Sequence, residues 1–405
     1  MDVFLKQTSA HCIELAKVSV SKEGFAGEDV RSSKEYETLE CELGKGNIGI
    51  SVYTKFYCDG DCMDESCGDA NIFRLTDVEK EGVRDALVNV CYEPTGGRNY
   101  IQKIRTTAYR MFSERLIEKL ESLKNDDASY CVFENLPVDD AFGSPQRDAD
   151  SFGFKNGYLS ENVLVALGSL IAEPYSIGHE GPKLVNDLVP HPEAAAEYTG
   201  NGSEVELDLH TENAFQTYDT RGDTSPLALM LLGVRSDPYT SGPKTWVADA
   251  RDALKTLSEM DIQLLYGKHF IIRQPYRWRN SGAQSGETRL YPILTGPISH
   301  PRVTAAFYPD MVVAVDEAAK NAYSKFYEAL KQIAHAVEIQ PGKLVYINNR
   351  FMLHSRDKFI PSFDPKGHAY RWVQRVFLTN NLWNFRTFKK SGARIFEPLP
   401  ADFKR

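Results

Sequence analysis

The chain has 405 residues and a formal net charge of −9 at neutral pH, and it contains no run of lysine or arginine. This balance argues against a nucleic acid or a membrane surface as partner and favours a small molecule. Because neither a charged leader with a long apolar segment nor an apolar stretch of about eighteen residues occurs, we expect a cytoplasmic protein. The sequence does not indicate the oligomeric state.

Residues 1–100 carry short apolar runs between polar stretches, and we expect an N-terminal extension packed on a core domain that spans 101–405. All seven cysteines precede residue 132, and this odd number favours free thiols in a reducing environment. Cys58, Cys62 and Cys67 stand among acidic residues and offer three thiolates to a second metal ion. Because no fourth Cys or His lies close by, we favour a solvated acidic loop there.

Two helices and two strands are predicted in the first part of the core domain. Apolar residues recur at helical spacing over 100–123, and a second, apolar helix is expected over 163–172. Residues 130–136 and 184–190 are typical of strands.

The stretch 205–215 reads V-E-L-D-L-H-T-E-N-A-F. Apolar and polar residues alternate in it, so a strand here buries one face and presents His210 and Glu212 on the other. A histidine and a carboxylate two residues apart supply two ligands of the 2-His-1-carboxylate site of non-haem Fe(II) enzymes. The alternative is a hydrogen-bonded histidine at a strand end beside an exposed carboxylate. His179 and His191 are possible third ligands, but we interpret both as structural.

The rest of the chain predicts many short strands and two long helices. Residues 216–225 form a polar loop next to the H-x-E pair and are a candidate lid. Short strands that enclose polar residues predict a mostly β fold with flanking helices, built on a double-stranded β-helix (jelly-roll) core. The predicted helices span 249–265 and 316–339, and the predicted strands lie at 227–234, 244–247, 269–273, 288–294, 303–307, 342–350 and 370–378.

Arg371 and Arg375 lie four residues apart on the last of these strands, so both side chains point to the same side of it. The alternative is a pair of exposed charges on an edge strand. The apolar residues around them, such as Trp372 and Phe377, disfavour this alternative. A buried guanidinium is costly unless an anion completes it, so the pair indicates anionic ligands.

Three motifs occur in order: H-T-E at 210–212, N-N-R-x-x-x-H-x-R at 348–356 and R-W-x-Q-R at 371–375. This ordered set resembles the clavaminate synthase-like Fe(II)/2-oxoglutarate-dependent oxygenases of the TauD/TfdA-type superfamily, in particular the branch that hydroxylates free amino acids such as arginine and asparagine. The resemblance extends from about residue 130 to about residue 384. It implies that His354 is the third metal ligand beside His210 and Glu212.

The resemblance also implies how the co-substrate and the substrate are bound. Arg371 is expected to hold the distal carboxylate of 2-oxoglutarate, a task that suits the planar guanidinium fork, with help from Thr245. Arg375 is expected to receive the α-carboxylate of the amino acid. Glu212 would then also meet the substrate ammonium group.

Further substrate contacts are implied at two places. The turn that holds Glu180 corresponds to a stretch beside the substrate. Arginine hydroxylases bind the guanidinium with acids in a segment similar to 306–311, where this chain has Phe307 and Pro309, and Asp310 is the remaining candidate. Arginine is therefore one option among free or modified amino acids.

The implied reaction is the O2-dependent decarboxylation of 2-oxoglutarate to succinate and CO2, coupled to hydroxylation of an unactivated C–H bond, as in natural product biosynthesis. Glu212 stands where related halogenases have Gly or Ala, which favours hydroxylation over halogenation. Three alternatives stay open: desaturation of the same substrate, a zinc hydrolase or lyase that uses the same three ligands, and a binding or storage barrel without activity. The zinc alternative leaves Arg371 and Arg375 without a task.

Overall fold

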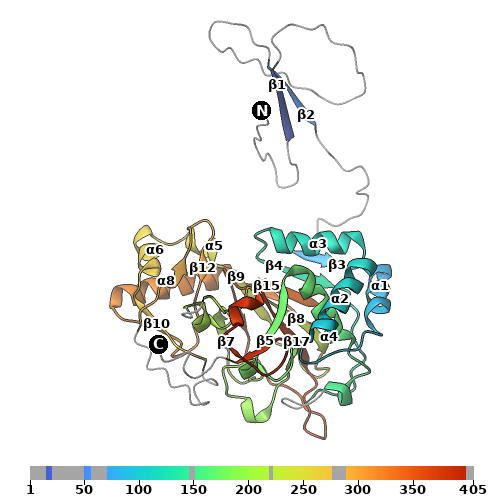
Figure 1. Cartoon of the computed structure of the whole chain (residues 1–405). Helices are drawn as coiled ribbons and strands as arrows, with labels where there is room; N and C mark the ends of the chain where they lie inside the picture. The colour runs from blue at the N-terminus through green and yellow to red at the C-terminus, as the bar shows by residue number, and fades with distance from the viewer. Residues whose placement is uncertain are drawn as a thin grey trace. The chain divides into compact units, whose positions relative to one another are not determined.

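The computed structural model describes residues 71–145, 151–218, 222–275 and 289–397, together with the backbone of two strands nearer the N-terminus. The chain divides into two compact units, Met1–Gly68 and Asp69–Arg405. In the first unit, β1 (Leu15–Val20) pairs with β2 (Ile50–Lys55) in antiparallel register (Figure 1). The segment with Cys58, Cys62 and Cys67 lies outside the described residues.

Residues 71–100, which we assigned to the N-terminal extension, belong to the second unit. There β3 (Ile72–Arg74) pairs in parallel with β4 (Tyr130–Glu134). The next element, α1 (Asp77–Leu87), begins with a capping box formed by Thr76 and Glu79. The division of the chain therefore differs from the expected boundary at residue 100, because long-range strand pairing and a shared apolar core join this segment to the rest.

The predicted helix over 100–123 consists of two helices, α2 (Arg98–Met111) and α3 (Glu114–Asn125). The break falls at Ser113, whose hydroxyl accepts a hydrogen bond from the Leu116 backbone N–H and caps α3. The next helix, α4 (Leu159–Ile171), starts earlier than predicted, and all of its residues are buried. It packs against α1, α2 and α3 and against β8 (Ala228–Arg235) and β17 (Trp372–Thr379) of the larger sheet.

Two sheets form the centre of the second unit. The larger follows the order β18, β19, β5, β17, β8, β15, β4, β3, with β6 paired to β17, and the smaller follows the order β14, β9, β16, β7. Most neighbouring strands are antiparallel, whereas β19 with β5 and β3 with β4 are parallel. The remaining strands of the larger sheet are β5 (Glu173–Ile177), β6 (Asn186–Leu188), β8 (Ala228–Arg235), β15 (Leu344–Asn348), β17 (Trp372–Thr379), β18 (Lys389–Lys390) and β19 (Ile395–Glu397). Those of the smaller sheet are β7 (Leu207–His210), β9 (Thr245–Asp249), β14 (His335–Val337) and β16 (Met352–Arg356).

The two sheets pack face to face. Leu229 and Leu231 of β8 lie in one apolar cluster with Val247 of β9. The alternate residues of the same strand, Met230 and Leu232, lie in a second cluster with α1 to α4. Because both faces of β8 are buried, its sequence is a continuous apolar run, as predicted.

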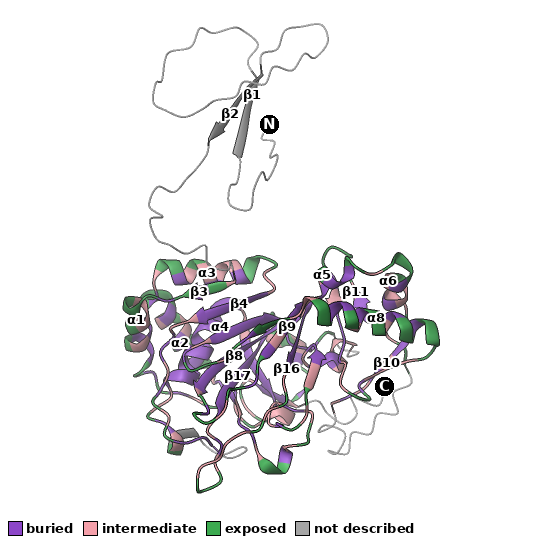
Figure 2. Ribbon diagram, turned by 180° about the vertical axis from the view of Figure 1, so that it is seen from behind, coloured by how far each residue is buried: buried purple, intermediate pink, exposed green. Residues whose placement is uncertain are grey.

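Helices cover the outer face of the smaller sheet. They are α5 (Ala250–Leu254), α6 (Glu259–Tyr266) and α8 (Glu317–Ile333), and their apolar residues share a cluster with β7, β9 and β16. In Figure 2 the buried residues concentrate in the strands and the exposed ones on the outer helices.

The helix predicted over 249–265 consists of two helices, α5 and α6, because Ser258 caps the start of α6. The predicted helix over 316–339 ends at Ile333, because β14 follows and pairs with β9.

Two predicted strands are much shorter in the structure. Within 289–294, the described part of the first of them, only Leu294 lies in a strand, β11 (Leu294–Thr295). Within 303–307 only Val303 lies in a strand, β12 (Arg302–Val303), which pairs with β11. The strand predicted at 269–273 is β10 (Phe270–Ile272), paired with β13 (Val312–Ala314).

The second unit is mostly sheet with several helices. In the part of the chain that the structure describes, no helix is long and apolar enough to cross a membrane.

Candidate active site

Strands β7 and β16 of the smaller sheet bring two histidines together. His210 and His354 are direct cross-strand partners, and their ring centroids lie 4.3 Å apart. Glu212 follows two residues after His210. One ligand atom from each of the three side chains lies within 4.8 Å of the other two, so the three residues predicted as metal ligands form a cluster that could hold a metal ion.

The His210 ring has the tautomer that a metal ligand needs. Its Nδ1 lies 2.8 Å from the backbone carbonyl oxygen of Asp208, and a carbonyl only accepts, so Nδ1 carries the proton and Nε2 keeps its lone pair. Burial and the neighbouring His354 lower the pKa of His210 to about 3. The ring is therefore neutral and available to a metal ion.

Glu212 is fixed through its backbone by Asn349. The Glu212 N–H donates to Asn349 Oδ1 (2.7 Å), and Asn349 Nδ2 donates to the Glu212 carbonyl (3.2 Å). Burial acts to raise the pKa of the Glu212 carboxyl, but Arg375 and the two histidines outweigh it and hold this pKa well below its usual range. The carboxylate is thus ionised, and its Oε1 lies 3.6 Å from His354 Nε2.

Arg375 forms two ion pairs within the site. Its NH2 donates to Glu180 Oε2 at 2.6 Å, and its NH1 donates to Glu212 Oε1 at 3.1 Å. The side chains of Arg375 and Glu180 are 5% and 1% exposed. Glu180, distant in the sequence, therefore already supplies an anion to this guanidinium, and the binding of a substrate α-carboxylate by Arg375 stays a prediction.

Arg371 lacks such a partner. It immediately precedes β17, and Arg371, Val373 and Arg375 alternate along the strand and line one cavity. Burial lowers the pKa of Arg371 to about 10. Among the described residues no carboxylate pairs with Arg371, and its guanidinium lies 5.4 Å from the Phe359 ring. Arg371 is thus a buried cation whose charge no carboxylate of the described residues balances.

A second such arginine, Arg356, was not among the predicted site residues. Its guanidinium donates to the backbone carbonyls of Gly202 and Val205 and lies near the same Phe359 ring, at 5.2 Å. Burial, and then repulsion from Arg371, lower the pKa of Arg356 to about 10. The H-x-R spacing could have indicated it, since a residue two positions after His354 on a strand points to the same side. Thr245, which was predicted to assist Arg371, is the cross-strand partner of Arg356.

The cavity encloses about 920 Å³ of space, open solvent at its mouth included. The predicted site residues that line it are His210, Glu212, His354, Thr245, Arg371, Arg375 and Glu180. Tyr198, Tyr308 and Asn213 also line it and were not predicted. Tyr198 and Tyr308 stack on each other with centroids 5.8 Å apart, and Tyr308 meets the His210 ring edge to face. Asp310, predicted to contact substrate, is not among the lining residues and forms an ion pair with Arg273.

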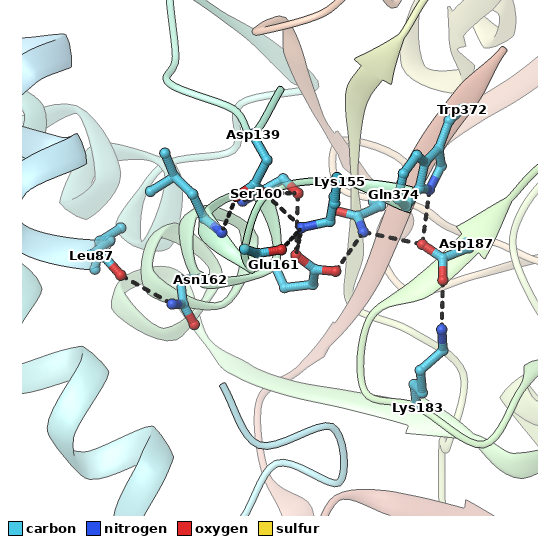
Figure 3. A network of polar contacts seen from close by, with 12 residues as sticks. Leu87, Asp139, Lys155, Ser160, Glu161, Asn162, Lys183, Asp187, Trp372 and Gln374 are labelled. Carbon is cyan, nitrogen blue, oxygen red and sulfur yellow. Dashed lines mark hydrogen bonds and ion pairs between the residues drawn. The ribbon is translucent and has the colours of Figure 1, made fainter. Parts of the chain in front are cut away.

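A buried polar network holds the other face of β17 (Figure 3). Gln374 Nε2 donates to Glu161 Oε1 (2.9 Å) and to Asp187 Oδ1 (3.1 Å), and Trp372 Nε1 donates to the same Asp187 oxygen (2.9 Å). These residues alternate along the strand with the arginines that face the cavity. The network therefore fixes the strand that presents both arginines.

A fully buried lysine completes this network. Lys155 Nζ lies 2.6 Å from Asp139 Oδ2 and 2.5 Å from Glu161 Oε2, and neither carboxylate is more than 2% exposed. Burial raises the pKa of Glu161, and Lys155 opposes that shift. The lysine supplies the positive charge that two buried carboxylates need.

Comparison with known proteins agrees with this architecture. Residues 131–377, more than half of the chain, match the family described as taurine catabolism dioxygenase TauD, TfdA family. The protein therefore belongs to this dioxygenase family.

Relatives and solved structures narrow the comparison. The chain is 27% identical to L-asparagine oxygenase of Streptomyces coelicolor over 274 residues, which is 66% of this chain and 76% of that protein. It is 29% identical to L-lysine 3-hydroxylase of Catenulispora acidiphila over 222 residues, 52% of this chain and 55% of that protein. A structure of asparagine oxygenase with Fe(II), 2S,3S-3-hydroxyasparagine and succinate superposes with a TM-score of 0.70 at 23% identity, covering 81% of this chain and 100% of that one. The non-heme iron oxygenase OrfP with Fe and alpha-ketoglutaric acid gives a TM-score of 0.68 at 24% identity over 80% of this chain and 99% of that one.

Proposed function

We propose that the protein is an Fe(II)/2-oxoglutarate-dependent oxygenase that hydroxylates a free or modified L-amino acid. The observation that carries the proposal is the cavity that joins a 2-His-1-carboxylate cluster to a buried arginine without a carboxylate partner. Family membership and the names of the relatives, which are oxygenases and hydroxylases of amino acids, support it.

His210, Glu212 and His354 would hold the Fe(II). Their chemistry fits the ion, because His210 keeps a lone pair on Nε2, His354 Nε2 lies next to the ionised Glu212 carboxylate, and the three donors converge. With 2-oxoglutarate and O2, bound Fe(II) supplies the oxidising power that attacks an unactivated C–H bond, while succinate and CO2 are released. Because Glu212 provides a carboxylate ligand, hydroxylation is favoured over halogenation, and desaturation stays the alternative outcome.

Arg371 would bind the distal carboxylate of 2-oxoglutarate, with Thr245 as a hydroxyl donor beside it. The charge of Arg371 is buried and not balanced within the described part of the chain. An incoming carboxylate would therefore offset part of the hydration energy that the guanidinium loses on burial. Arg356 adds positive potential at the same end of the cavity. A zinc hydrolase or lyase would leave both cations without a ligand.

Arg375 and Glu180 would bind the zwitterionic end of the amino acid. The substrate α-carboxylate would take the place of Glu180 at the Arg375 guanidinium, and Glu180 would turn to the α-ammonium. In this exchange the Arg375–Glu180 ion pair is replaced by two ion pairs with the substrate. Every charge keeps an opposite partner. The exchange also keeps the substrate next to Glu212 and the metal.

We further propose that the two sheets form the double-stranded β-helix (jelly-roll) core, because they share an apolar core and both contribute residues to the lining of the cavity. The oxygenase domain would comprise the second compact unit, with the N-terminal extension limited to the first.

The test is a screen of free L-amino acids with Fe(II), 2-oxoglutarate and O2, in which mass spectrometry detects a gain of one oxygen and succinate is measured in parallel. Substrate-dependent succinate with an equal amount of hydroxylated product supports the proposal. A loss of two hydrogens instead indicates desaturation. Activity that depends on zinc and needs no 2-oxoglutarate would contradict the proposal.

A further inference from the structure

We infer that the substrate side chain is uncharged and accepts a hydrogen bond, as a carboxamide or a ureido group does, and that diamino acids and arginine are disfavoured. This inference rests on the proposed function and narrows its substrate class. It favours a substrate like that of the relative named for asparagine over one like that of the relative named for lysine.

The first observation concerns the acidic residues of the cavity. Among the described residues that line it, Glu180 and Glu212 are the acidic ones, and Arg375 pairs with both. Glu212 also belongs to the metal cluster, and Glu180 is the partner for the α-ammonium group in the exchange described above. No lining carboxylate in this part of the chain is left to pair with a second substrate cation.

Asp310 does not supply the missing carboxylate. Its neighbours Tyr308 and Met311 line the cavity, but Asp310 itself does not. Its backbone has a φ of 64°, and its side chain, 42% exposed, pairs with Arg273 outside the lining. A guanidinium in the cavity would therefore have to draw Asp310 out of an existing ion pair.

The charge balance of the site points the same way. Arg356, Arg371 and Arg375, together with Fe(II), outweigh the two glutamates and the 2-oxoglutarate dianion. The cavity with both bound would thus carry a net positive charge before the amino acid binds. A zwitterion adds no net charge, whereas a second cation meets unscreened repulsion in a buried space.

The second observation concerns Asn213, which directly follows Glu212. Asn213 lines the cavity, is 6% exposed, and its Nδ2 has no hydrogen-bond partner among the described residues. Its backbone has a φ of 50°, a conformation that asparagine adopts more readily than most residues. A buried amide N–H is costly without an acceptor. Nδ2 itself is not accessible from the cavity, so the Asn213 side chain would turn toward a carbonyl oxygen of the substrate side chain, which would provide the acceptor.

The experiment compares L-arginine with L-citrulline, which replaces the terminal cation with a carbonyl at nearly the same shape, and L-lysine with L-glutamine. We expect kcat/KM for the neutral member of at least one pair to exceed that of its cationic partner by about a hundred-fold or more. Equal or better turnover of arginine and lysine overturns the inference while the proposed function stands. If no free amino acid couples succinate formation to a product, the proposed function fails instead.

Asn213→Asp tests the residue that carries the argument, since aspartate keeps the shape and tolerates the same backbone conformation. The new carboxylate should shift the ratio of arginine to citrulline turnover toward arginine by about ten-fold or more. Succinate formation without substrate reports that metal and co-substrate still bind. Asn99→Asp, at the exposed start of α2, is the matched control and should leave the ratio unchanged.

An unchanged ratio in Asn213→Asp would contradict the assigned contact. The competing view, that Asp310 reaches a cationic side chain, predicts that Asp310→Asn alone lowers arginine turnover. That result would also overturn the inference.

Discussion

Replacement of Arg371 by methionine tests how the co-substrate is held. Burial lowers the pKa of Arg371 from its ordinary value to about 10, which corresponds to a cost of about 3 kcal/mol for the charged form. If the distal carboxylate of 2-oxoglutarate offsets half or all of this cost, removal of the guanidinium weakens 2-oxoglutarate binding by about ten-fold to more than a hundred-fold. The same cost burdens the ligand-free protein, so Arg371→Met should not lower the free energy of unfolding measured without 2-oxoglutarate.

The assay is titration calorimetry of 2-oxoglutarate with the metal-loaded protein, combined with urea unfolding of the ligand-free protein. Arg371→Lys keeps the charge but not the planar fork and should fall between wild type and Arg371→Met. Arg386→Met removes an exposed arginine that does not line the cavity and is the control. An unchanged dissociation constant in Arg371→Met would refute this reasoning and transfer the role to Arg356.

Three further substitutions test a metal ligand, a substrate-binding arginine and the buried lysine behind β17. His354→Ala should abolish Fe(II) binding in a metal analysis and abolish turnover, and near-wild-type activity would rule out the triad. Arg375→Ala should raise KM for the amino acid by about ten-fold to a hundred-fold, while succinate formation without substrate survives; an effect on 2-oxoglutarate alone would contradict its role. Lys155→Met leaves two buried carboxylates without a cation and should cost about 3–5 kcal/mol in urea unfolding. Lys255→Met, which breaks an exposed pair with Asp252, should cost less than about 1 kcal/mol, and equal losses in the two lysine variants would show that burial does not decide the effect.

Features of the site that depend on local periodicity could be predicted from the sequence. The H-x-E spacing placed His210 and Glu212 near each other, and the spacing of Arg371 and Arg375 placed both in one cavity. The strand predicted along 205–215 was wrong in its extent, because β7 ends at His210 and Glu212 lies in the turn that follows it. His354 followed from the resemblance rather than from periodicity, because its cross-strand register with His210 joins segments far apart in the chain.

Caps and strand pairing explain where the predicted elements were wrong. The apolar spacing of 100–123 continues across Ser113, but the hydroxyl of this residue satisfies a free backbone N–H and starts a new helix. The helix predicted over 316–339 continues the apolar spacing past Ile333, where pairing of β14 with β9 outweighs helix formation. Periodicity reports which face is buried and not where the hydrogen bonding changes.

The partner of a buried charge is the property that the sequence conveys least. Arg371 and Arg375 share one motif and one side of β17, and the sequence gives no reason to treat them differently. The structure separates them, because Glu180 approaches Arg375 from a turn 195 positions earlier in the chain, while nothing comparable reaches Arg371 in the described residues. An arginine with an internal partner can exchange it for a zwitterion, and an arginine without one needs a permanent anion. The two guanidiniums are therefore suited to different ligands, an amino acid that changes from substrate to substrate and a co-substrate that is the same in every turnover.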